Sequence, residues 1–203
     1  MMIPSLAGIF GKTDQTTAPA SIEELDSRYS EVAEPLEKKL ASNPDDMETT
    51  LSLAETYMSW GYNVSYMATV DAETSHANEL FAKAMSLFDA YIAANPDTSG
   101  QAKVDRALCL LYSGDTGNAL SAMKTITEED PENAIAWANL GLLYEINGDS
   151  ESARTAYEAA IEHDPDNAQG AKTYASSRLL SLNNNGNTDS LPTALRDLSG
   201  TGV

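Results

Sequence analysis

The chain has 203 residues, with 31 acidic against 12 basic side chains and a formal net charge of −19. A chain of this length can bury most of its apolar surface, either as one domain or as a stack of repeats. The negative charge repels phosphate backbones and anionic lipid, so we expect no nucleic-acid and no membrane partner. A well-solvated surface explains the charge, and a basic partner is the alternative.

The first residues and the single cysteine give the next expectations. Residues 1–10 are apolar but lack a basic leader and a long uninterrupted core, so they match neither a signal peptide nor a membrane span. We therefore expect a cytoplasmic protein, the alternative being an exported protein whose signal has been removed. Residues 1–20 are expected to form a mobile arm. Cys109 stands in an apolar run and is expected to be a buried small hydrophobe.

Proline-containing turns recur along the chain and divide it into helical runs. Proline disfavours helical geometry in the residue before it, and a following Asp or Asn can cap the next helix. Each turn is therefore expected to end one helix and start another. The turns are Asn43-Pro44-Asp45-Asp46, Asn95-Pro96-Asp97-Thr98, Asp130-Pro131-Glu132-Asn133 and Asp164-Pro165-Asp166-Asn167.

The second half of the chain repeats itself every 34 residues, as the spacings of Pro131 to Pro165 and of Ala119 to Ala153 show. The last full unit contains, in order, Trp137, Leu140, Gly141, Tyr144, Ala153, Tyr157, Ala160 and Pro165. Their order and spacing resemble the tetratricopeptide-repeat pattern. The resemblance implies an all-α fold, a right-handed α-solenoid of antiparallel helix pairs, with about three repeats plus flanking and capping helices.

Two glycines of this unit have a physical role in such a helix pair. Gly141 lies on the same helix face as Trp137 and Tyr144, and its missing side chain lets the second helix approach closely. Gly148 permits the tight turn between the two helices.

The pattern also divides the chain, with a helix expected before the first repeat from residue 21 to 40, kinked or restarted at Pro35. In the first repeat, Gly61 is expected at the turn. The pattern of the second helix begins further along the chain than the 34-residue period predicts, which indicates an insertion. An insertion of this length would extend both helices into a hairpin. The expected solenoid spans 21–182, with repeats at about 47–98 (insertion 62–78), 100–133 and 134–167, a capping helix at 168–182, and a tail at 183–203 with a short helix at 191–198.

The resemblance implies that the first helix of each pair lines a concave surface, the usual peptide-binding site of the family. Aligning the repeats identifies the residues that would line this surface, and they form an apolar groove. Such a groove suits an amphipathic helix or an extended apolar segment. The alternative is that neighbouring helices already cover these side chains. The expected groove residues are Val104, Leu108, Leu111, Tyr112, Ala138, Leu142, Glu145 and Ile146.

The insertion is the second expected interface, because it concentrates apolar and aromatic side chains that the repeat does not require. These residues are Tyr62, Val64, Tyr66, Met67 and Val70. They could instead cover the open first edge of the solenoid. A third option is that residues 3–10 or 191–198 fill the groove of the same chain or of a second copy.

Catalysis has little support in the sequence. His76 and His163 lie far apart in the repeat layout, and neither has a cysteine or second histidine at metal-ligand spacing. Phosphate-binding glycine motifs are absent. We therefore expect no catalytic residue, no metal and no cofactor. The hypothesis is a non-catalytic scaffold or adaptor that binds another polypeptide; the alternatives are a homodimerising module, paired through the insertion or termini, and an accessory factor in the assembly of another protein complex.

Overall fold

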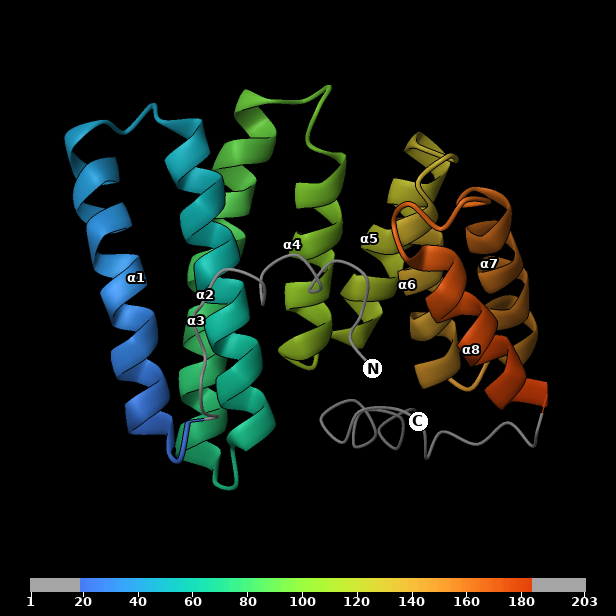
Figure 1. Ribbon diagram of the computed structural model, residues 1–203, viewed down its shortest axis with the longest axis horizontal. Coiled ribbons are helices and arrows are strands. Elements are labelled where there is room, and N and C mark those ends of the chain that lie inside the picture. Colours follow the sequence, from blue (N-terminus) through green and yellow to red (C-terminus); the bar gives the residue numbers. More distant parts are fainter. Residues whose placement is uncertain (1–18, 184–203) are drawn as a thin grey trace. The chain divides into compact units, whose positions relative to one another are not determined.

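A computed structural model describes residues 19–183, so the predicted arm at residues 1–20, except for its last two residues, and the predicted helix at 191–198 lie outside the described residues. The described part is helical throughout and contains no strand (Figure 1). Its helices are α1 (Ile22–Ser42), α2 (Met47–Met67), α3 (Asp71–Ala94), α4 (Gly100–Tyr112), α5 (Thr116–Glu129), α6 (Ala134–Ile146), α7 (Ser150–Glu162) and α8 (Ala171–Asn183). The all-α prediction is confirmed.

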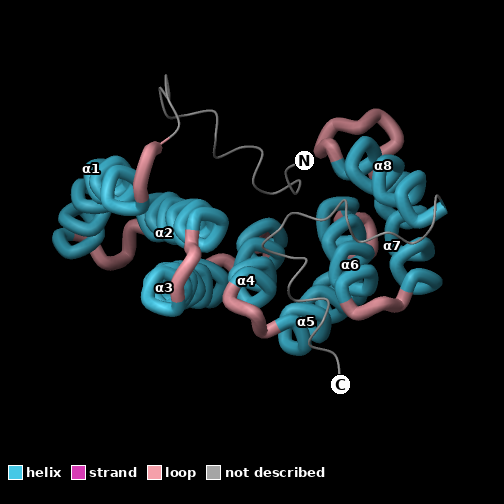
Figure 2. Tube along the Cα trace, turned by 90° about the horizontal axis from the view of Figure 1, so that it is seen from below, coloured by secondary structure: helices cyan, strands magenta, loops and turns pink. Residues whose placement is uncertain are grey.

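The helices form two compact units, α1 to α4 in one and α5 to α8 in the other. In the first unit, α2 and α3 are the most extensively paired helices, with α1 beside α2 and α4 against α3 and α2 (Figures 1 and 2). In the second unit α6 pairs with α7, α5 packs on α6, and α8 packs on both α7 and α6. Each unit is thus built from neighbouring helices joined by short turns.

The local signals for helix ends act as predicted at several turns. The Asp46 carboxylate accepts a hydrogen bond from the Thr49 amide at 3.0 Å, and the Asn133 side chain accepts one from Ala136 at 2.9 Å. Gly148 has a φ of 77°, in the left-handed region that glycine adopts without strain. The predicted caps and the predicted turn glycine are therefore confirmed at these positions.

The structure corrects the local predictions at two places. Helix α1 continues through Pro35, so no second helix begins there; the Pro35 ring is exposed, and the Glu31 carbonyl that loses its helical partner is at a solvent-exposed position. Gly61 lies inside α2 instead of at a turn, and a Cβ there would come within 2.9 Å of the Phe81 ring. Its role is the close approach of α3, and the turn falls at residues 68–70.

Gly141 has the role that the repeat pattern indicates. A Cβ at this position would lie 2.5 Å from Cε1 of Tyr157, so only glycine allows the α7 ring to lie against α6. The surrounding core of this unit uses small side chains for the same close packing, among them Ala134, Ala138, Ala153 and Ala160.

An aromatic cluster joins α1, α2 and α3 in the first unit. The ring of Trp60 stacks on Tyr29 and Tyr57, with centroids 5.8 and 6.1 Å away, and meets His76 edge-on. The indole N–H donates to Asp26 at 2.6 Å, and the same carboxylate oxygen lies 3.0 Å from Nε2 of His76. Burial raises the pKa of Tyr29 to about 12. This cluster fixes α1 against the α2–α3 hairpin.

Candidate functional site

The residues expected to line the groove are almost all inside the protein. Leu108 and Leu142 have no exposed surface, Glu145 is 3% exposed, and only Tyr112 is half-buried. The other four, Val104, Leu111, Ala138 and Ile146, are buried as well. They do not present an open apolar strip in this structure, and their role in partner binding stays a prediction.

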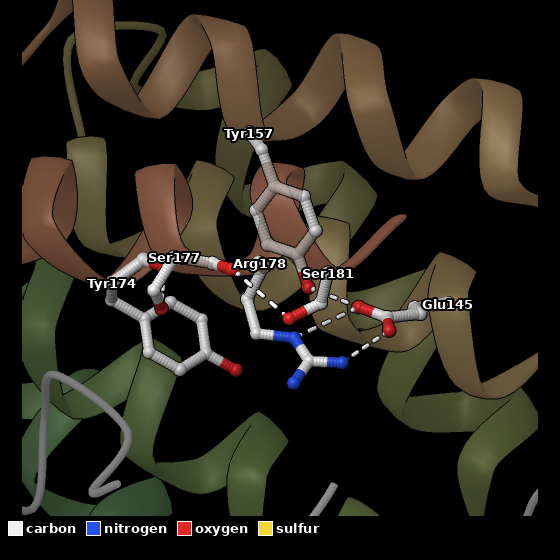
Figure 3. Close-up of polar contacts among 6 residues, drawn as sticks. All are labelled: Glu145, Tyr157, Tyr174, Ser177, Arg178 and Ser181. Carbon is white, nitrogen blue, oxygen red and sulfur yellow. Dashed lines mark hydrogen bonds and ion pairs between the residues drawn. The ribbon is translucent and has the colours of Figure 1, made fainter. Parts of the chain in front are cut away.

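Glu145 has partners that the repeat pattern did not indicate (Figure 3). Its carboxylate accepts a hydrogen bond from the Tyr157 hydroxyl at 2.9 Å and one from Nε of Arg178 at 3.1 Å, and it also pairs with Nη2 of Arg178. Burial opposes the charge of Arg178, but the Glu145 carboxylate raises its pKa. Helix α8 therefore supplies the group that satisfies this buried acid.

The insertion residues divide between the core and the surface. Val64 is fully buried, and Tyr62 packs edge-on against Tyr112 of α4 with centroids 5.0 Å apart. Tyr66 and Val70, in contrast, are 65% and 56% exposed, and Met67 is half-buried. We call Tyr66, Met67 and Val70 the hairpin-end patch. It lies at the end of α2, in the connecting turn and beside the start of α3, at the bottom of Figure 1.

The turn that carries the hairpin-end patch is held by one acidic side chain. Oε2 of Glu73 accepts hydrogen bonds from the amides of Thr69 at 2.6 Å and Val70 at 3.2 Å. The bond from the Thr69 amide is the main reason that the pKa of Glu73 is lowered. The turn is thus fixed before any partner arrives.

The two histidines belong to different compact units. His76 pairs with Asp26 in the first unit, and His163 lies 3.4 Å from Glu132 in the second. The thiol of Cys109 is buried, and burial raises its pKa well above the usual value. Within residues 19–183, no three His, Cys, Asp or Glu side chains gather in an arrangement that could hold a metal ion. No helix in this range is long and apolar enough to cross a bilayer.

Comparison with known proteins places the repeat. A family model described as tetratricopeptide repeat matches residues 104–168, from α4 to the turn after α7. Residues 104–168 are thus a tetratricopeptide-repeat segment. Among solved structures the chain is similar to the crystal structure of MamA, with a TM-score of 0.55, 20% sequence identity and 90% of each chain covered. Comparison with curated protein sequences gives no match.

At this identity the likeness to MamA shows the fold alone. The fold class, a helical solenoid of the tetratricopeptide type, is confirmed, and such repeats are consistent with a protein–protein interaction scaffold. The family signal comes from the second half of the chain, where the 34-residue period is clearest. The lengthened α2–α3 hairpin lies outside the matched segment, so the family match does not account for it.

Proposed function

We propose that this protein is a non-catalytic scaffold that binds a partner polypeptide through the hairpin-end patch. The exposure of Tyr66 and Val70 is the observation that carries the proposal. The large hydrophobic side chains exposed in the described residues are Val32, Tyr66, Val70 and Leu180, and two of the four belong to this patch. Concentrated exposed apolar surface is typical of an interaction site.

The energetics favour a contact at this place. Tyrosine offers a large, stiff apolar ring with a polar tip, which is why it is enriched at interfaces. Full burial of one large apolar side chain contributes about 1.5 to 3 kcal/mol. Because Glu73 already holds the turn, little conformational entropy is lost when a partner binds.

Self-association through the same patch is the second candidate. The acids beside the patch, Asp71 and Glu73, weigh against it, because a symmetric pairing of two hairpin ends brings like charges together. The net charge of −19 acts in the same direction. These charges favour a partner that carries basic residues around an apolar contact.

Binding in the concave groove is the other mode that the repeat suggests. It requires a partner to reach side chains such as Leu108 and Leu142, which have no exposed surface in this structure. The hairpin-end patch needs no such rearrangement. We therefore place the first contact there, and a role in assembling another protein complex would follow from the identity of the partner.

Site-specific photo-cross-linking tests the proposal. A benzophenone amino acid replaces Tyr66 in one variant and Ala90, exposed on the same helix pair away from the turn, in the control. We expect a cross-linked partner polypeptide from Tyr66 and none from Ala90. Light scattering over a dilution series accompanies it, and a constant monomer mass is expected. A concentration-dependent dimer whose Tyr66 cross-links only to a second copy would replace the proposal by self-association.

A further inference from the structure

A cleft opens between α6 and α7 in the second unit, apart from the residues expected to line the groove. It has a volume of about 280 Å³. Helix α6 contributes apolar and aromatic side chains to its lining, and α7 contributes mostly polar ones. The lining residues are Trp137, Leu140 and Tyr144 of α6 with Glu151, Ser152, Thr155 and Ala156 of α7.

The aromatic walls of the cleft are held in place. The indole N–H of Trp137 donates to the Pro131 carbonyl at 2.7 Å, so the ring is anchored at its polar edge. The ring of Tyr144 already has a cation over it, since Nζ of Lys124 lies 5.2 Å from its centroid. Because Lys124 already lies over the Tyr144 ring, Trp137 is the aromatic side chain of the cleft with which a guest cation would stack.

The charges at the rim favour a cation. Glu151 is exposed, and it makes no ion pair within the part of the chain that the structure describes. Asp149 is a further acid near Lys124, and its pKa is lowered mainly by hydrogen bonds from Ser152 and in smaller part by Lys124. The remaining basic residue of α7, Arg154, is not among the lining residues. Among the residues that line the cleft, Glu151 is thus the charged one, and its charge is negative.

A guest for this cleft needs an apolar stem and a cationic, preferably planar, end. The stem would pack against Leu140 and Ala156, which are 3% and 2% exposed, and the planar cation would stack on the ring of Trp137. Arginine combines these properties, and its guanidinium matches a carboxylate such as Glu151 with two parallel hydrogen bonds.

We infer that the cleft between α6 and α7 binds an arginine side chain of a basic partner polypeptide. The inference rests on the proposed function in one respect, that the natural ligand is a polypeptide. It names a second contact surface, in the other unit from the hairpin-end patch. Together the two surfaces define a partner with an apolar segment and at least one accessible arginine.

The test is a titration of the full chain followed by nuclear magnetic resonance of the Trp137 indole N–H, assigned with a Trp137→Phe variant. The probe is the capped tripeptide Gly-Arg-Gly, and the matched probe replaces arginine by citrulline, which has nearly the same shape without the charge. We expect saturable shifts of Trp137 and of the α6 and α7 amides with the arginine peptide, and at least fivefold weaker binding of the citrulline peptide.

Variants locate the charge that matters. Glu151→Gln should weaken binding of the arginine peptide by about fivefold or more. Glu158 is an exposed acid on the same helix that does not line the cleft, and Glu158→Gln should leave the binding unchanged. Absence of a Trp137 shift, equal binding of the citrulline peptide, or an equal effect of the two variants would overturn the inference.

The cleft and the hairpin-end patch can be tested separately, because each can be removed while the other stays intact. A variant with Tyr66→Ser and Val70→Ser lacks the hairpin-end patch and should still bind the arginine peptide in the cleft. Conversely, Glu151→Gln should still cross-link through position 66. A negative titration with intact cross-linking removes only the cleft, and the reverse result removes only the hairpin-end patch.

Discussion

Glu145 of α6 and Arg178 of α8 form an ion pair in which both side chains are buried, 3% and 6% exposed. The hydroxyl of Tyr157 from α7 donates to the same carboxylate, so three helices meet at one charged group (Figure 3). The last described helix is therefore tied to the preceding pair by a satisfied polar network as well as by apolar packing.

Removing one member of this pair should cost far more than removing both. Arg178→Met leaves the Glu145 carboxylate buried with only the Tyr157 hydroxyl as its partner, and we expect the free energy of unfolding to fall by about 3 to 5 kcal/mol. The double variant Glu145→Met/Arg178→Met should lie much closer to the wild type. Urea denaturation followed by circular dichroism measures both. If Arg178→Met alone stays within about 1 kcal/mol of the wild type, the pair does not anchor α8.

Gly141 and Gly117 provide a matched test of close packing. Gly141→Ala places a methyl group against the fully buried Tyr157, and we expect a loss of about 1 to 3 kcal/mol. Gly117→Ala meets nothing within 4 Å on an exposed helix surface, so it should be neutral or stabilise the protein by up to about 1 kcal/mol. Thermal unfolding of both variants checks the prediction, and equal effects would contradict it.

The Asp46 cap predicts a specific dependence of stability on pH. Bonds from the Thr49 amide, Lys39 and the Thr49 hydroxyl lower the pKa of Asp46 from 3.8 to about 2. Its stabilising contribution is therefore present above about pH 4 and is lost as the pH falls through 2. Asp46→Asn keeps a cap acceptor without the charge, so its melting temperature should fall less than that of the wild type between pH 4 and pH 2. Parallel curves for the two proteins would show that this carboxylate is not linked to folding.

The groove residues should behave as core residues. Leu142→Ala removes atoms from a side chain without exposed surface, and we expect a loss of about 2 to 5 kcal/mol. Leu180→Ala, at a position 64% exposed, should change stability by no more than about 0.5 kcal/mol. Leu142→Glu should not fold, because it buries an unpaired charge. A folded and stable Leu142→Glu protein would instead show that this position is open to a partner.

The elements that could be predicted from the sequence are those fixed by local chemistry. Proline turns, Asp46 and Asn133 as caps, and the packing of Gly141 against the second helix all depend on residues close in sequence or on the repeat spacing. Gly61 was predicted at a turn, although close helix approach and a tight turn both select glycine. Only the observed packing against Phe81 separates the two.

The surfaces could be predicted only in part. The register assigned Glu145 to an open groove, but Tyr157 of the second helix and Arg178 of α8, a helix outside that repeat, both bond to its carboxylate. The apolar residues of the insertion could either cover the edge of the solenoid or be exposed for a partner. In the structure Tyr62 and Val64 pack inside the protein, whereas Tyr66 is exposed. The cleft was not predicted, because its lining combines α6 and α7 side chains whose packing the repeat spacing does not specify.

Isothermal titration calorimetry with the cross-linked partner tests most directly whether the hairpin-end patch binds a polypeptide. The Tyr66→Ser/Val70→Ser variant should bind at least about tenfold more weakly than the wild type, because two apolar contacts are lost. The control Val32→Ser/Leu180→Ser removes the other two exposed hydrophobic side chains and should bind as the wild type does. Unchanged affinity of the folded Tyr66→Ser/Val70→Ser variant would show that the partner does not bind through the hairpin-end patch.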